Sequence, residues 1–281
     1  MGAETTNIST GKITPDELTE GFQRLGLSEG DQVVLHASLT AIGDVDGGAA
    51  MVIHRLLRSL GKEGTLLMPT FTFVARHSTT HENYTKPGCW CGENENRHVP
   101  FIPELQPDKS LGEIAHRLCS WPSSKRSRHP AYSFVAVGKE TDNLIHSSSL
   151  SDPLQPLKTF LRREPVVVTL GVGLESVFAI HIAEQRFLPS KFSSERALIV
   201  TSRGQEWVDV LAVGCSNGFV RLETQLDGST VKETRIGSAR SRLYPMKTLV
   251  KKAEESLNRD HAALSCERTE CLSCSRIASR N

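Results

Sequence analysis

The most constraining feature of this sequence is a series of short apolar runs that alternate with longer segments of helical spacing. The runs at residues 32–36, 65–69 and 165–170 are apolar along almost their whole length, which is typical of strands covered on both faces. The segments between them place apolar residues three or four positions apart, which indicates helices. The pattern predicts an α/β fold in a single domain, with a mixed central sheet and helices on both faces.

Helix and strand signals extend this alternation along the chain. Thr14 and Pro15 favour a helix start before residues 16–27, and Gly61 is a typical stop after a helix over 49–60. Ser110 and Glu113 form the pattern of a capping box. Further helices are expected over 110–118, within 151–161 after a turn, and over 174–184, 219–226 and 247–257, and further strands over 132–137, 198–201 and 207–213.

Charge and hydropathy patterning exclude several classes of function. The 281 residues carry 33 Lys and Arg against 32 Asp and Glu, a net charge of +1. Nucleic-acid binding and polybasic membrane anchoring both need an excess of basic residues, so we expect neither a nucleic acid nor a membrane as a partner. The sequence shows no apolar run of 18 residues and no signal peptide, so we expect a cytoplasmic protein. The expected organisation is a domain over residues 1–258 and a Cys-rich tail over 259–281.

One candidate for acid–base chemistry is the pair His181 and Glu184, in the stretch AIHIAE. Residues three apart share a helix face, and a carboxylate that reaches an imidazole fixes its tautomer and raises its basicity. The alternative is an exposed helical pair without a role in catalysis. His36 is a second candidate because it ends an apolar run, and strand ends in α/β sheets are where ligands bind; the alternative is a core histidine.

Two further motifs point to anion binding. Gly171-Val172-Gly173 follows an apolar run and precedes a helical segment, an arrangement that can present backbone N–H groups to an anion. A dinucleotide fingerprint is not favoured, because Ser176 stands where the third glycine of that motif would be. Arg126 and Arg128 lie two apart, and guanidinium groups suit phosphates. The alternatives are a tight turn for the glycines and a solvated loop for the arginines.

Taken in order, these motifs resemble the aminoglycoside 3-N-acetyltransferase family, also called the antibiotic N-acetyltransferase family. The matching blocks extend over roughly residues 14–257. They are HASLTAIG at 36–43, GGA at 47–49, GTLLMPT at 64–70, RS at 126–127, HP at 129–130, SFVAVG at 133–138, LGVG at 170–173, HIAE at 181–184, GCSNGF at 214–219, IGSA at 236–239 and RL at 242–243.

The resemblance implies an α/β fold distinct from the GNAT acetyltransferase fold, acetyl-CoA as the donor, and an amine of an aminoglycoside or related aminosugar as the acceptor. It also implies that His181 and Glu184 form the catalytic pair, with His36 close by. Direct attack of the amine on the thioester is expected, without an acyl-enzyme. Residues expected to bind the cofactor are Ser38, Leu39, Arg126, Arg128 and Gly173; the two arginines are assigned from their charge.

The acceptor is less constrained by the sequence. Asp152 interrupts a Ser-Pro-Leu pattern that many relatives carry, and an acidic side chain suits a cationic acceptor; the alternative is a turn residue. Thr70 is the other residue assigned to the substrate. The loop at 77–100 differs from the family and leaves open a different small amine from secondary metabolism, or a catalytically inactive CoA-binding relative. A homodimer also remains open.

Seven cysteines stand in unequal groups along the chain. Cys266, Cys271 and Cys274 have metal-ligand spacing, and Cys89, Cys91 or His98 would complete a tetrahedral zinc site. An iron–sulfur cluster is a weaker alternative, because no matching fourth cysteine follows the first three. From sequence we favour no metal. Cys215 is interpreted as a structural thiol, with a nucleophile as the alternative.

Overall fold

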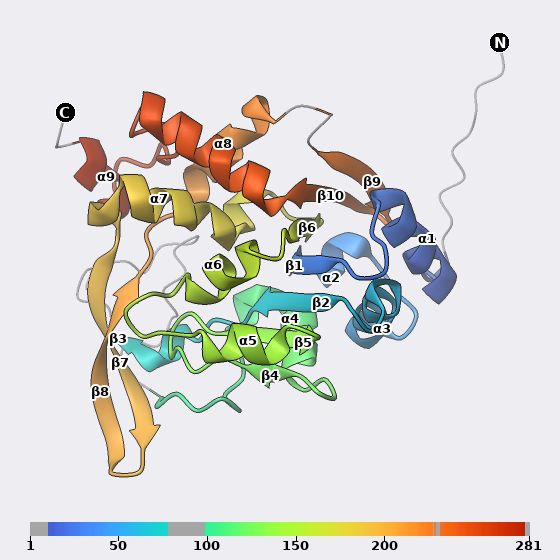
Figure 1. The fold of residues 1–281 in the computed structure, drawn as a ribbon, viewed down its shortest axis with the longest axis horizontal. Coiled ribbons are helices and arrows are strands. Elements are labelled where there is room, and N and C mark those ends of the chain that lie inside the picture. Colours follow the sequence, from blue (N-terminus) through green and yellow to red (C-terminus); the bar gives the residue numbers. More distant parts are fainter. Residues whose placement is uncertain (1–10, 78–98, 227, 229–230, 279–281) are drawn as a thin grey trace.

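The computed structural model describes residues 11–77, 99–226, 228 and 231–278. Its centre is a seven-stranded sheet of order β4-β5-β2-β1-β6-β10-β9, accompanied by a three-stranded sheet of order β3-β7-β8 (Figure 1). The strands are β1 (Gln32–Ala37), β2 (Thr65–Pro69), β3 (Arg76–His77), β4 (Lys125–Arg126), β5 (Phe134–Gly138), β6 (Val166–Leu170), β7 (Ser193–Thr201), β8 (Gly204–Ala212), β9 (Lys232–Ile236) and β10 (Ala239–Pro245).

The central sheet is mixed, as predicted. Strand β1 runs parallel to β2 and β6, whereas β5 and β10 pair antiparallel with β2 and β6. The carboxyl ends of the three parallel strands therefore meet at one edge of the sheet. At that edge the register aligns His36 of β1 with Thr169 of β6, Thr169 with Arg242 of β10, and Arg242 with Glu233 of β9.

Helices cover both faces of the sheet and enclose two apolar cores (Figure 1). One core lies beneath α1 (Pro15–Leu25), α3 (Gly48–Leu60) and α4 (Gly112–Cys119). The other lies beneath α5 (Thr141–His146), α6 (Gln155–Leu161), α7 (His181–Phe187) and α8 (Met246–Arg259). The remaining helices are α2 (Leu39–Ile42) and α9 (Leu272–Ala278).

The capping signals are confirmed at the first helix and corrected at the fourth. Thr14 accepts the amide of Glu17 while the Glu17 carboxylate accepts the amide of Thr14, which is a complete capping box. Ser110 does not cap a helix. Its amide and hydroxyl both donate to Asp108, which caps a 3-10 turn (η2, Lys109–Leu111), and α4 begins only at Gly112. The Ser110 hydroxyl, which was expected to cap the helix, instead donates to the Asp108 carboxylate.

The helix predicted over residues 174–184 is wrong in its first half. Two 3-10 turns, η3 (Leu174–Ser176) and η4 (Phe178–Ile180), precede α7, and Val177 stands between them in an extended conformation. Val177 is fully buried, so tertiary packing overrides the helical spacing here. The segment predicted as a helix over 219–226 is likewise a 3-10 helix, η6 (Asn217–Gln225).

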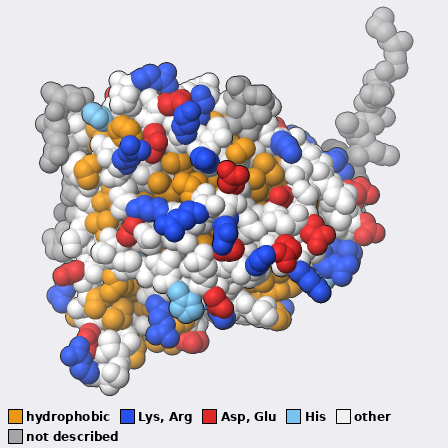
Figure 2. All heavy atoms as spheres, viewed as in Figure 1, with side chains coloured by type: hydrophobic (Ala, Val, Ile, Leu, Met, Phe, Trp, Pro, Cys, Tyr) orange, Lys and Arg blue, Asp and Glu red, His pale blue; other side chains and the backbone are white. Residues whose placement is uncertain are grey.

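Three other features complete the fold. The strands expected over 198–201 and 207–213 do pair, as the antiparallel hairpin β7–β8, whereas β9 and β10 were not predicted. Residues 259–278 pack on the body, because Leu264 and Ile277 belong to the core beneath α8. Among the described helices, none is both long and apolar enough to cross a membrane. Basic and acidic side chains are interspersed on the face shown in Figure 2.

Candidate active site

The structure joins His181 and Glu184 and adds a third residue, Lys191. Nδ1 of His181 lies 2.6 Å from Oε2 of Glu184, within the first turn of α7. The other carboxylate oxygen, Oε1, accepts a hydrogen bond from Nζ of Lys191, at the end of the turn η5 (Pro189–Lys191). All three side chains are buried, with 0–2% of each exposed, so the exposed-pair alternative does not hold.

The surroundings of this triad determine its charge states. Rings of Phe178 and Phe219 lie 5.0 and 4.8 Å from the His181 ring, centroid to centroid. Burial lowers the pKa of His181 below its ordinary value, although Glu184 acts to raise it. Burial is the largest influence on Lys191 and acts to lower its pKa, but the charge and hydrogen bond of Glu184, together with Cys274 and Cys215, outweigh it and the pKa is raised. At neutral pH the imidazole is therefore neutral and the ammonium is charged.

A second polar group lies on the same face of the sheet as His181. Strand alternation places His36 with Val34, in the core that also holds the rings around His181. Among the described residues, Nε2 of His36 and Oγ1 of its cross-strand neighbour Thr169 are buried without a hydrogen-bond partner. Burial lowers the pKa of His36 to about 3. Two orphaned polar atoms at the ends of parallel strands mark a place for a polar ligand atom.

The turn that follows β6 lies against the turn that follows β1. The amide of Ser38 donates to the carbonyl of Leu170 (2.9 Å), and the Ser38 hydroxyl caps α2. Gly171 has φ +69°, and a Cβ there would lie 2.2 Å from Cβ of Ala41. The glycine is needed for both its backbone conformation and this close approach. The segment that carries Ser38 and Leu39 is thereby held against the turn at Gly171, two residues before Gly173.

Every nitrogen of the Arg126 guanidinium donates hydrogen bonds to other groups of the protein. Nε donates to Thr70 and Ser133 hydroxyls, and the two terminal nitrogens donate to the Thr70 carbonyl, the Thr72 hydroxyl and the carbonyls of Pro103 and Leu105. All five N–H groups have acceptors, so this geometry favours a structural clamp over the predicted phosphate contact. Thr70 is fully buried inside the clamp, which also disfavours its predicted contact with substrate.

Asp152 and Arg128 differ in how far they are engaged. The Asp152 carboxylate accepts from Nζ of Lys158 (2.6 Å), from the Leu154 amide and from Nε2 of Gln185. An acid already neutralised by a lysine has little charge left for a cationic acceptor, so the turn-and-pairing alternative is favoured. Arg128 is exposed. Its neighbour His129 is buried, with Nδ1 accepting the Tyr132 amide and burial lowering its pKa to about 4.

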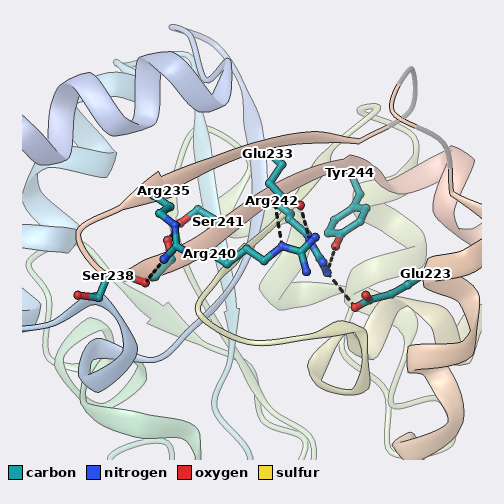
Figure 3. A network of polar contacts seen from close by, with 9 residues as sticks. Glu223, Glu233, Arg235, Ser238, Arg240, Ser241, Arg242 and Tyr244 are labelled. Atoms are coloured by element: carbon teal, nitrogen blue, oxygen red, sulfur yellow. Dashed lines mark hydrogen bonds and ion pairs between the residues drawn. The ribbon is translucent and has the colours of Figure 1, made fainter. Parts of the chain in front are cut away.

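Arg242 is a buried residue whose position sequence reasoning did not interpret. Figure 3 shows its side chain reaching from β10 to Glu233 of β9 and Glu223 of η6, with the Tyr244 hydroxyl on the same group. Nε lies 2.9 Å from Glu233, and Nη1 lies 2.8 Å from Glu223. The network ties η6 to the sheet, and η6 carries the Phe219 ring that contacts His181. Neither Lys191 nor Arg242 has a local sequence signal, because their carboxylate partners lie on other elements of the fold.

Three cysteines of the C-terminal tail lie beside Cys215, which was not grouped with them from the sequence. Cys215, Cys266, Cys271 and Cys274 lie together, with their sulfur atoms within 4.8 Å of one another. The partners expected from sequence, Cys89, Cys91 and His98, lie outside the described residues, as does most of the loop at 77–100. Cys215 interacts electrostatically with Lys191 of the triad.

The fold and the site together define a class of protein. A buried histidine in its neutral form, with Nδ1 held by a carboxylate, has Nε2 available to take a proton from a bound substrate. Here that group contacts aromatic rings of the core that covers one face of the mixed α/β sheet. The fold and the site therefore define an α/β protein with a buried candidate histidine for acid–base chemistry.

Comparison with known proteins identifies the family. The sequence profile of the aminoglycoside 3-N-acetyltransferase family matches residues 34–258, and the chain belongs to this family. It is thus an acyltransferase-class enzyme. It is 29% identical over 248 residues to an aminoglycoside N(3')-acetyltransferase-like protein, YokD, of Bacillus subtilis, covering 86% of this chain and 91% of that one. It is 30% identical to aminoglycoside N(3)-acetyltransferase IX of Micromonospora chalcea, over 63% of this chain and 64% of that enzyme.

Solved structures confirm the fold. The crystal structure of YokD from Bacillus subtilis superposes with a TM-score of 0.81 at 28% identity, covering 90% of this chain and 96% of that chain. The enzyme AAC-IIIb in its binary complex with CoASH superposes with a TM-score of 0.75 at 21% identity, covering 89% of this chain and 97% of that chain.

Proposed function

We propose that this protein transfers the acetyl group of acetyl-CoA to an amine of an aminoglycoside or related aminosugar, with His181 as the general base. The observation that carries the proposal is the buried His181–Glu184 contact of 2.6 Å in a chain of this family. The relative solved with CoASH supports acetyl-CoA as the donor, and the relatives' names support the acceptor class. A donor and acceptor of this kind are consistent with the cytoplasmic location predicted from sequence.

The proposed reaction assigns one atom to each step. Nε2 of His181 takes a proton from the acceptor's ammonium, because an amine attacks only when its lone pair is free. The amine nitrogen then bonds to the thioester carbonyl carbon, and backbone N–H groups at the turns stabilise the oxyanion. The carbon–sulfur bond breaks with its electron pair on sulfur, and the proton from His181 completes CoASH. The acylated nitrogen releases its remaining extra proton to solvent and becomes the neutral amide. Glu184 holds the imidazole tautomer and stabilises the imidazolium.

For the donor, we propose that Ser38, Leu39 and Gly173 contact CoA, and that exposed Arg128 reaches its phosphates. Ser38 and Leu39 follow β1, Gly173 follows β6, and Arg128 lies on an exposed loop. The two strand ends are at the edge of the sheet where ligands bind in α/β folds. We propose His36 and its neighbour Thr169 as positioning residues for a polar atom of a substrate. Arg126, Thr70 and Asp152 are given no part in binding, because their polar groups are engaged within the protein.

The first experiment is CoA thiol release from acetyl-CoA with a panel of aminoglycosides, simpler aminosugars and nucleosides, each against a no-acceptor control. Release that depends on an aminoglycoside supports the proposal and identifies the amine for product analysis. If no acceptor of the panel releases CoA but calorimetry shows acetyl-CoA binding, a different small amine acceptor is favoured. If no CoA is released and no CoA binding is seen, the enzymatic proposal is contradicted.

The His181→Ala variant tests the base. We expect kcat to fall at least ~100-fold, the low end of a general-base contribution, with acetyl-CoA affinity retained. His54→Ala is the matched control, because His54 lies exposed on α3 and its loss leaves kcat unchanged. Near-normal turnover in the His181 variant would remove this residue from the mechanism.

A further inference from the structure

Four cysteines from three separate segments converge beside the triad. Cys215 lies between β8 and η6, Cys266 follows α8, and Cys271 and Cys274 open α9. Their sulfur atoms lie within 4.8 Å of one another, and all four thiols are free. Zinc bound by four thiolates at about 2.3 Å needs sulfur atoms roughly 3.8 Å apart at the corners of a tetrahedron. A disulfide would instead bring two sulfurs to about 2.05 Å and leave the other pair apart.

We propose that Cys215, Cys266, Cys271 and Cys274 form a tetrahedral structural zinc site that fastens the C-terminal tail to the body of the enzyme. Cys271-x2-Cys274 has the spacing of a zinc knuckle. Four protein ligands close the coordination sphere and leave no open position for substrate, so the role is structural. The site is independent of the proposed function, which uses none of these sulfur atoms.

The backbone around the sulfurs is arranged for thiolates. The amide of Asn217 donates to Sγ of Cys215, and the amide of Cys266 donates to Sγ of Cys274, each at 3.4 Å. Donors of this kind stabilise the negative charge of a ligating sulfur and fix its direction. The hydroxyl of Ser273 accepts the amide of Cys215 at 3.1 Å, which joins the two halves of the site directly.

Charge and close packing also support a zinc site at these four cysteines. Four thiolates around Zn²⁺ leave a net charge of −2, and the buried ammonium of Lys191 interacts electrostatically with both Cys215 and Cys274. Helix α9 packs against η5, which carries Lys191. A Cβ on Gly214 would lie 2.2 Å from Oγ of Ser273, and one on Gly218 would lie 2.3 Å from the carbonyl oxygen of Leu264. The tail thus lies directly on the segments that surround the triad.

Metal content of the purified full chain is the primary test. The protein is kept reduced, and zinc and iron are measured by mass spectrometry against protein concentration. We expect about one zinc per chain, retained in Cys119→Ser and lost in Cys271→Ser and in Cys266→Ser. Cys119 is the matched control because it is a free cysteine outside the cluster. Zinc near zero in the wild type, iron with sulfide in its place, or zinc unchanged by both cluster variants overturns the proposal.

A second measurement does not depend on the variants folding. Wild-type protein is stripped with a chelator and titrated with Co²⁺, whose visible spectrum reports tetrahedral thiolate coordination. We expect saturation at about one equivalent, and displacement of Co²⁺ by Zn²⁺. We also expect protease cleavage within residues 259–278 to become faster in the stripped protein and to slow again when Zn²⁺ is added. A cobalt spectrum without thiolate bands, or a tail equally protected with and without metal, contradicts the site.

Discussion

Glu184 is the residue on which the candidate site depends most. One of its oxygens contacts His181 and the other contacts Lys191, and none of these side chains is exposed by more than 2%. An uncompensated carboxylate at this depth would be protonated or would destabilise the fold. The ammonium of Lys191 lies against one Glu184 oxygen and compensates its charge, while the other oxygen holds Nδ1 of His181. With Nδ1 engaged by Glu184, Nε2 is the ring nitrogen to which the proposed base role is assigned.

Buried histidines make the stability of the protein depend on pH. Burial lowers the pKa of His36 to about 3 and that of His129 to about 4, whereas both titrate near 6.5 when unfolded. Between these values the unfolded chain binds more protons, so the free energy of unfolding falls as the pH drops below about 6.5. Each such histidine contributes about 1.4 kcal/mol per pH unit in that window.

The His36→Gln variant isolates one of these contributions. Denaturant unfolding at several pH values between 7 and 4.5 gives the slope of stability against pH. We expect a shallower slope than in the wild type, since one neutral buried imidazole has been removed. His54→Gln, at an exposed position, keeps the wild-type slope. An unchanged slope in His36→Gln would show that His36 is not held neutral in the folded state.

At the scale of elements, the site is organised by turns at the ends of β1 and β6. The turn after β6 is held against α2 by the Ser38–Leu170 hydrogen bond and by the contact between Gly171 and Ala41. Two 3-10 turns then bring the chain to His181, where α7 begins. A displacement of the turn after β6 therefore reaches both Gly173 and the start of α7, which carries the candidate pair His181 and Glu184.

The Gly171→Ala variant tests this coupling. Its left-handed conformation, φ +69°, costs about 1–2 kcal/mol for a residue with a Cβ. The clash with Ala41 adds about 1–3 kcal/mol from overpacking. Gly30→Ala is the control, since Gly30 has φ +89° and nothing within 4 Å of the added Cβ, so we expect only the conformational cost. Equal losses of stability in the two variants, measured in denaturant, would contradict the close packing of the turn against α2.

At the scale of the whole molecule, one sheet separates two apolar cores. Phe22 of α1 is fully buried on one face and Phe160 of α6 on the other. The strands between them contribute alternate side chains to both cores: Val34 belongs to one and Leu35 to the other. Because neither core can be opened without exposing the other side of the same strands, the body should unfold as one cooperative unit.

Phe22→Ala and Phe160→Ala test this cooperativity. Each truncation should lower the free energy of unfolding by about 3–5 kcal/mol, the usual cost of a buried phenylalanine. In both variants we expect circular dichroism and tryptophan fluorescence to follow a single shared transition in denaturant. Two separated transitions, with one core melting ahead of the other, would show that the faces of the sheet are energetically independent.

The strands and the pairing of His181 with Glu184 were predictable from the sequence because both patterns are local. An apolar run records burial on both faces within five or six residues, as in β2 and β6, and the spacing of His181 and Glu184 places them on one helical turn. The same reasoning failed where a longer-range contact outweighed a local preference. Asp108 displaced Ser110 as a cap, and the burial of Val177 broke a helical pattern.

The tertiary structure alone decided which side chains from different elements lie against one another. Lys191 reaches Glu184 because η5 folds back on α7, and Thr169 and Arg242 meet across β6 and β10. Arg126 resembles a phosphate ligand by its charge, yet the surrounding loops supply acceptors for all of its N–H groups. Cys215 joins the cysteines of the tail although about fifty residues separate it from Cys266. Charge and ligand type are properties of a residue, but pairing and burial depend on where the rest of the chain has folded.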